Sequence, residues 1–442
     1  MAPIWLAKLA SSAATQQLFS RETETASSDP TSTAGSMALQ WRQPAGILDV
    51  LLLVGAPVVR CAIAQLAGRI VTPVAFSFGW VGYAVSVVLS SFGDGRLMPE
   101  SETSLMVVDT NSGHGRTTST WVIGRLFRDF NDRLMESMKD EEPHISSDVS
   151  EVQTLGSASE KEEKIVTKRK PFEGLRVTVF EVEENPPTPH GVPTLDWVWY
   201  SGCVVIIVQL GIAAVPWVAN GRWDTFLVTA AGNLFSLIGG SIPQWRREKW
   251  ACPKNGSKDH IIITEGNGSR SAMVILGKKD VGLKFEVLAR STRLAPATLS
   301  TKLVTSLLAV LWILLLITVA GIVEDTWSTT DLLGIGLLGS IQNLIAAGVH
   351  RSPAALGIHI REVDTIRARF VAETLKEVEH KYPRVGTSLL DIFFPGSMRI
   401  KEENTEDITF WRAALERRLA KNKHGIRLDR LPPAAQQEKL PR

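Results

Sequence analysis

The sequence predicts an all-α membrane protein with about six transmembrane helices in three hairpins, a small cytosolic α/β element and C-terminal amphipathic helices. Two observations predict this fold. The 442 residues are 44% hydrophobic and 21% charged, but long charge-free blocks alternate with strongly charged ones, which is typical of multi-pass membrane proteins. Several blocks exceed about 18 apolar residues, the length that lets a helix cross the hydrocarbon core of a bilayer.

Five blocks are apolar and free of charged residues. They cover residues 70–93, 197–221, 225–245, 303–323 and 332–349. A sixth block, 47–68, is interrupted by Asp49, Pro57 and Arg60. We include it as a span because only a tight connection separates it from the next block. The sequence therefore predicts three hairpins, over 46–93, 195–245 and 303–349.

The distribution of Lys and Arg predicts the orientation of these hairpins. The short link 218–224 holds one basic residue and the link 324–331 holds none. By contrast, the loops 94–195 and 244–302 hold 12 each, and the tail 350–442 holds 18. Basic segments next to spans stay on the cytosolic side of a membrane. Six crossings then place both termini in the cytosol. The membrane is either the plasma membrane or an endomembrane.

Two segments lack the large apolar residues that a folded core requires, and we expect both to be disordered. These are the N-terminal extension 1–45 and the Ser- and Glu-rich linker 139–170. A mitochondrial presequence is the alternative for residues 1–36.

Short elements are predicted between and after the spans. An apolar stripe predicts a helix over 121–138, and alternation predicts a strand over 174–181. Residues 259–264 and 271–276 read as two strands around a glycine-containing turn. A phosphate-binding loop is the alternative there, but it requires a helix rather than a strand behind it.

Three further helices are predicted along the chain. A short helix is expected over 282–293. In the tail, apolar residues at spacings of three and four predict amphipathic helices over 362–381 and 405–423.

The sequence contains no recognisable catalytic, metal-binding or nucleotide-binding motif. Cys61, Cys203 and Cys252 stand far apart, which excludes a disulfide scaffold and a cysteine zinc site. The eight histidines show no metal-binding spacing, and no nucleophile or nucleotide motif occurs. We therefore predict no catalytic residue, no cofactor and no metal. A net charge of +2 also gives no basic field for nucleic acid.

Polar residues inside the predicted spans are the candidate functional residues, because polar groups in hydrocarbon are costly. They are Asp49, Arg60, Gln209, Asn233, Gln342 and Asn343.

The two charged candidates cannot pair with each other. Asp49 and Arg60 are 11 residues apart, or about 16 Å along a helix. We expect Asp49 to reach the cytosolic headgroups and Arg60 to extend toward the opposite surface.

The neutral amides are expected to hydrogen-bond across helices. Gln342 and Asn343 are adjacent and point about 100° apart, so we expect them to face different neighbours, one of them at the level of Asn233.

Small residues at intervals of four predict seams where helices pack closely, within the chain or in a homo-oligomer. The seams are Gly82/Ser86/Ser90, Gly232/Ser236/Gly240 and Gly336/Ser340.

Three segments of the chain are distinctive: FGDGRLMPE (92–100), WVIGRLFRDF (121–130) and GSIQNLIAAGVHRSPAALGIHI (339–360). In these segments the chain resembles a group of uncharacterised polytopic membrane proteins predicted from filamentous fungi. The resemblance extends from about residue 37 to about residue 410, and suggests Met37 as an alternative start. It implies about six spans and cytosolic appendages, and it assigns no activity.

Two function classes fit these expectations. A non-catalytic membrane scaffold, with the lipid bilayer and cytosolic proteins as partners, fits the short outer links and the large cytosolic mass. A small-solute or ion transporter fits the amides within the spans, and a membrane enzyme is a weaker third reading. Broken helices paired across an inverted repeat would favour transport. The three hairpins share one orientation, so we favour the scaffold.

Overall fold

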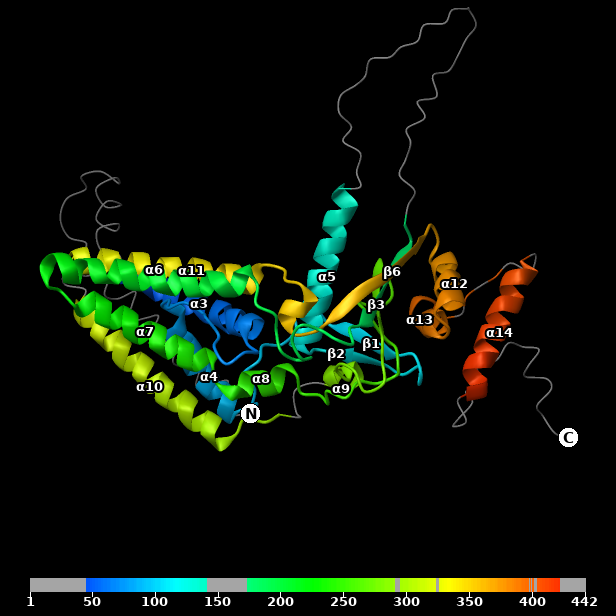
Figure 1. The fold of residues 1–442 in the computed structure, drawn as a ribbon, viewed down its shortest axis with the longest axis horizontal. Helices are drawn as coiled ribbons and strands as arrows, with labels where there is room; N and C mark the ends of the chain where they lie inside the picture. The colour runs from blue at the N-terminus through cyan, green and yellow to red at the C-terminus, as the bar shows by residue number, and fades with distance from the viewer. Residues whose placement is uncertain are drawn as a thin grey trace, which may run out of the picture.

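The computed structural model describes residues 45–140, 173–290, 295–322, 326–396, 398, 400 and 404–421. A helical bundle occupies one end of the molecule, and a β-sheet covered by further helices occupies the other (Figure 1). The predicted disorder of 1–45 and 139–170 lies almost entirely outside the described residues.

The prediction of an all-α fold is wrong, because a six-stranded mixed sheet lies beside the bundle. Its strand order is β2-β1-β4-β5-β3-β6, and only β3 and β5 run parallel. The strands are β1 (Leu105–Asp109), β2 (Gly115–Thr118), β3 (Leu175–Val182), β4 (Ile261–Thr264), β5 (Ser271–Leu276) and β6 (Ile360–Ala368). They come from four segments separated by spans and loops, so no local pattern indicates that they form one sheet.

The hairpin between β4 and β5 confirms the predicted glycine turn. The two strands pair antiparallel, and the N–H of Ser269 donates to Gly266 O at 3.1 Å. Gly266 and Gly268 have φ angles of 105° and 92°, which other residues rarely adopt. The strand predicted over 174–181 is likewise confirmed as β3.

The helix predicted over 362–381 is wrong in its first half. Residues Ile360–Ala368 form β6, and only α12 (Val371–Lys381) is helical. The apolar spacing of three and four suggested a helix throughout this segment. Val363, Thr365 and Ile366 are β-branched, however, and β-branched residues favour a strand. Pairing with β3 then fixes the extended conformation.

Helices cover one face of the sheet. Leu375 of α12, Leu389 of α13 (Val385–Phe393) and Trp411 of α14 (Thr405–Lys421) share a core with Val177 and Val274 of the sheet. The predicted helices over 121–138 and 405–423 are confirmed as α5 (Trp121–Asp140) and α14. The helix expected over 282–293 is shorter, as α9 (Phe285–Ala289).

Four helices are long and apolar enough to cross a membrane, and they match the last four predicted spans. They are α6 (Trp197–Asn220), α7 (Asp224–Gly240) with the short α8 (Pro243–Lys249) behind it, α10 (Leu299–Ile322) and α11 (Thr326–Gly348). Trp197 and Trp217 are 61% and 48% exposed and lie about 30 Å apart along α6. This spacing suits the two interfaces of a bilayer.

The first predicted hairpin is different. Helix α3 (Ala45–Leu66) is followed by a non-helical stretch over 68–78 and the short helix α4 (Gly79–Phe92). Pro73 has no N–H, and it disfavours helix at Thr72 before it, which explains the break.

The chain from 68 to 93 enters and leaves the bundle at the same end, so we name it the re-entrant loop. Gly68 lies against Pro193 and Trp250 at the sheet end of the bundle. On leaving α4 the chain is again at that end, where the N–H of Ala297 donates to Gly95 O at 3.1 Å. The predicted second span is therefore not a crossing.

Six helices form a closed ring around the non-helical part of this loop. In order, α6, α7, α10, α4, α3 and α11 each pack against the next, and α11 packs against α6. Figure 1 shows α3 and α4 between the long helices.

Candidate functional site

The re-entrant loop brings four of the predicted polar residues together. On α11, Gln342 Oε1 accepts the N–H of Ala75 at 3.2 Å. The neighbouring Asn343 Nδ2 donates to Ala75 O at 3.2 Å and to Ser77 Oγ at 3.0 Å. Gln342 and Asn343 are 3% and 1% exposed. Two adjacent side chains thus hold both polar groups of one residue.

The next residue of the loop is held from two other helices. Asn233 Oδ1 on α7 accepts the N–H of Phe76 at 3.1 Å. Gln209 Nε2 on α6 donates to Phe76 O at 2.8 Å and to Ile335 O at 2.9 Å. The side-chain amides thus satisfy the backbone N–H and C=O groups of the loop, which have no intrahelical partners. Peptide groups at membrane depth must be satisfied within the protein.

The expectation that Gln342 and Asn343 face different neighbours is wrong. Gln342 bonds the N–H of Ala75 and Asn343 bonds its C=O, so both side chains reach one residue although they leave α11 in different directions. The sequence identified the amides, but not their shared target.

Glycines make room for the loop. A Cβ on Gly202, Gly232, Gly336 or Gly339 would overlap a backbone oxygen or an aromatic ring of the loop. The predicted helix-packing seams on α7 and α11 are corrected accordingly, since Gly232 and Gly336 contact the re-entrant loop rather than another helix.

Aromatic rings fill the space beside the amides. Trp312 of α10 stacks on Phe76 and on Trp80, with ring centroids 6.0 and 5.7 Å away. Trp80 Nε1 donates to Ala75 O at 3.0 Å, so it shares this oxygen with Asn343. All three rings are at most 2% exposed. The centre of the ring of helices is thus packed with side chains.

Arg60 does not extend toward the opposite surface as predicted. Its Nε donates to Leu97 O at 2.8 Å and its Nη2 to Met98 O at 3.1 Å. Glu248 accepts the N–H groups of the same two residues, both at 2.8 Å. Arg60 therefore fixes the chain that leaves α4, because α3 ends beside the sheet. The side chain of Asp49 lies outside the described residues.

A second polar group, which the sequence reasoning missed, lies between the bundle and the sheet. We call it the junction cluster, and its charged members are Arg125, Asp129, Asp196, Lys249 and Arg351.

Two basic side chains of this cluster meet the last carbonyls of α3. Lys249 is fully buried, and its Nζ donates to Gln65 O at 3.0 Å and Ala67 O at 2.8 Å. Arg351 Nη1 also donates to Gln65 O at 2.8 Å. Its Nε and Nη2 bind both carboxylate oxygens of Asp196 at 2.6 and 2.7 Å. Carbonyls that lack an intrahelical partner at a helix C-terminus explain why hydrogen-bond donors lie there.

The end of α11 is held in the same way. Arg125 Nη2 on α5 donates to Val349 O at 2.7 Å and pairs through Nε with Asp129 at 3.1 Å. Asp129 Oδ2 accepts the N–H of Arg351 at 3.0 Å. Burial raises the pKa of Asp129, and the adjacent Arg125 opposes this effect. No sequence signal shows which residues meet these helix ends.

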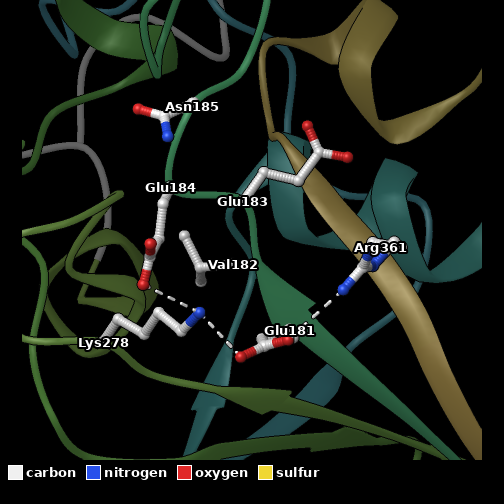
Figure 2. A pocket seen from close by; sticks show the side chains of 7 residues that line it. All are labelled: Glu181, Val182, Glu183, Glu184, Asn185, Lys278 and Arg361. Carbon is white, nitrogen blue, oxygen red and sulfur yellow. Dashed lines mark ion pairs between the residues drawn. The ribbon is translucent and has the colours of Figure 1, made fainter.

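A pocket of about 290 Å³ lies at the carboxyl ends of the parallel strands β3 and β5 (Figure 2). Lys278 Nζ is 2.7 Å from Glu181 and 3.1 Å from Glu184, and Arg361 is 3.7 Å from Glu181. The hydrogen bond from Lys278 lowers the pKa of Glu181. A charged ligand would have to displace these ion pairs. Within the described ranges, no group of three or more His, Cys, Asp and Glu is placed to hold a metal ion.

Comparison with known proteins adds no further assignment. The chain matches no family model, no curated protein and no solved structure.

Proposed function

We propose that the protein is a non-catalytic membrane scaffold, whose bundle holds the sheet and its covering helices at one membrane surface for other proteins to bind. The observation that carries this proposal is a continuous hydrophobic core. It includes Trp80 and Trp312 inside the bundle and Phe180 and Ile263 on the sheet.

The junction cluster strengthens the same connection. Helix α5 packs on the sheet through Phe130 and Phe180. Its Arg125 and Asp129 bond Val349 O and the N–H of Arg351 at the end of α11, so these bonds oppose separation of the two parts. Alternating access requires one part of a transporter to move against another. A packed core and buried ion pairs instead favour a fixed relationship between membrane and sheet.

The proposal places the sheet and the tail in the cytosol, following the basic segments beside α7 and α11. With the re-entrant loop removed from the count, α3 and the four long helices make five crossings. Helix α3 has 22 residues and is about 33 Å long, enough for one crossing. The N-terminal side of α3 then faces away from the cytosol, which replaces the expectation that both termini share one side.

Transport of a small solute is the second candidate, and one observation favours it. Re-entrant segments and amides at the midplane also occur where a membrane protein binds or conducts a solute. Here, however, the loop is fixed by glycine contacts and aromatic packing, so conduction would require it to move.

Flux through liposomes separates the two functions. The purified full chain is reconstituted, and release of potassium, chloride and a small neutral solute is compared with that from empty liposomes. A scaffold gives equal release. Release above the empty control that Gln209→Met abolishes would overturn the proposal, because that change removes an amide from the loop and leaves the sheet untouched.

The scaffold also predicts contacts with partners. Quantitative cross-linking in native membranes should yield a reproducible set of cytosolic proteins. The charge reversal Arg361→Glu, on an exposed residue of β6, should change that set without lowering the amount of protein in the membrane. A set identical to that of an unrelated multi-pass protein would argue against the scaffold.

A further inference from the structure

We propose that Asn267, in the turn between β4 and β5, is a site at which the chain modifies itself by deamidation. Asparagine followed by glycine is chemically labile, because a glycine nitrogen has no neighbouring Cβ to keep it from the side-chain carboxamide. The sequence contains three such pairs, Asn220-Gly221, Asn255-Gly256 and Asn267-Gly268. The last two are even followed by the same residue, serine. The structure, and not the sequence, separates them.

The reaction requires no partner other than water. The backbone nitrogen of Gly268 forms a bond to Cγ of Asn267, the Cγ–Nδ2 bond breaks, and ammonia leaves with the proton of the glycine N–H. Water then adds to the resulting succinimide ring and opens it at either carbonyl. The product is aspartate, or isoaspartate with the backbone running through the side-chain carbon. Both carry a negative charge that asparagine lacks, and no group is oxidised or reduced.

The hydrogen bonds of the glycine N–H groups distinguish the three pairs. The N–H of Gly221 donates to Trp217 O at 2.9 Å, and that of Gly256 donates to Gly282 O at 3.0 Å. The N–H of Gly268, by contrast, has no hydrogen-bond partner among the residues that the structure describes. A bonded nitrogen can attack only after its hydrogen bond has broken, which costs free energy. Asn267 is therefore the pair member that faces an available nitrogen.

The shape of the turn explains why this N–H is available. The N–H of Ser269 donates to Gly266 O at 3.1 Å, which makes Asn267 and Gly268 the two central residues of a β-turn. The turn bond uses the N–H of the fourth residue and leaves that of the third outside it. Gly268 supplies the positive φ, 92°, that the third position of such a turn requires. Both central residues are exposed, and a Cβ on Gly268 would meet nothing within 4 Å, so the carboxamide has room to approach.

Deamidation would change the sheet at this turn. Strands β4 and β5 lie in the middle of the sheet order and are buried almost throughout. Isoaspartate adds one carbon to the backbone of the turn that joins them, so the turn must rearrange. The new carboxylate also lies two residues from the exposed Glu265, which places two negative charges in the turn. The site holds whether or not the protein is a scaffold.

Incubation of the purified full chain in water labelled with heavy oxygen tests the site. Opening of the succinimide incorporates the label, so peptide mass spectrometry after digestion in ordinary water separates this reaction from earlier damage. Asn267 should convert roughly tenfold faster than Asn220 and Asn255, whose glycine N–H must first give up a hydrogen bond. Its rate should rise with pH, because the deprotonated nitrogen is the attacking group.

The unfolded chain is the matched control, since Asn255 and Asn267 are both followed by Gly-Ser. In denaturant these two residues should convert at similar rates. Conversion of Asn255 as fast as that of Asn267 in the folded protein would overturn the proposal. So would an Asn267 that stays intact in the folded protein while it reacts in denaturant, or a preference for Asn267 that persists unchanged after unfolding.

Discussion

The α-carbon of Gly339 packs directly against the carbonyl oxygen of Phe76, leaving no room for a side chain on α11 at this point. Gln209 donates to the same oxygen from α6. Backbone of the re-entrant loop and backbone of a spanning helix are thus in contact, which only glycine allows.

The substitution Gly339→Ala should destabilise the protein strongly. The added methyl group overlaps Phe76 O and must displace the loop from its amides, at a cost of about 1–3 kcal/mol or more. Thermal unfolding in detergent measures the change. Gly334→Ala is the matched control on the same helix, since a Cβ there meets nothing within 4 Å, and it should leave the melting temperature unchanged or raise it. Equal melting of both variants would contradict the packing described.

The substitution Asn343→Leu should also lower stability. It removes the bonds to Ala75 O and Ser77 Oγ. Ala75 O keeps Trp80 Nε1 as a donor, but Ser77 Oγ loses its donor while buried, which costs about 1–3 kcal/mol. Leu344→Val, at a 60% exposed position on the lipid side, is the control and should have little effect. A stable, normally assembled Asn343→Leu protein would show that the amide is not a structural bond.

The substitution Arg351→Met should loosen the ends of α3 and α6 beside the sheet. It leaves Asp196 without its cation, while Gln65 O keeps Lys249 as a donor. Breaking a buried pair costs about 3–5 kcal/mol, and the 20% exposure of Asp196 lowers this cost. Hydrogen exchange should increase at the end of α3 before it increases in the centre of α6. Arg361→Met removes an exposed pair and should leave exchange unchanged. Equal exchange in both variants would count against a structural role for the cluster.

Stability should fall on acidification because of His260. Burial lowers the pKa of this residue, and its Nδ1 accepts the N–H of Gly277 at 3.3 Å. The unfolded chain, with a pKa near 6.5, then takes up the proton first. The stability contributed is complete above pH 6.5 and is lost as the pH falls through the folded pKa.

Melting curves at pH 7.5 and 5.5 measure this effect. The variant His260→Gln keeps an acceptor for Gly277 and cannot titrate, so its melting temperature should depend less on pH than that of the unmodified protein. His380→Gln, at an exposed position, should keep the full dependence. A pH response unaltered by His260→Gln would assign the acid sensitivity to other groups.

Topology can be read from labelling in intact cells. In a background without native cysteines, Ala45→Cys should react with an impermeant reagent from the non-cytosolic side, whereas Ala297→Cys should react only after permeabilisation. The acceptor sequences at Asn255 and Asn267 should carry no glycan, because the proposed topology places them on the cytosolic side. Protection of Ala45→Cys until permeabilisation would restore an even number of crossings.

The sequence by itself determined the elements whose signals are local. Helices α6, α7, α10 and α11 follow from uninterrupted apolar composition, α5 from its amphipathic stripe, and the β4–β5 turn from two glycines. Of the six candidate polar residues, four converge on one loop, because an amide in hydrocarbon must find a partner wherever the fold supplies one.

Only the tertiary structure decided which partner that is. Residues 70–93 have the composition of a spanning helix, yet their first part is not helical. Side-chain amides of three other helices bond its backbone, and glycines of these helices leave space for it. The strands of the sheet are far apart in the chain and stabilise one another only once paired. Lys249 and Arg351 meet the end of α3 across the fold. The physical reason is the same for the loop, the sheet and the end of α3. The hydrogen bonds that fix them join residues distant in sequence, so local composition and periodicity cannot predict them.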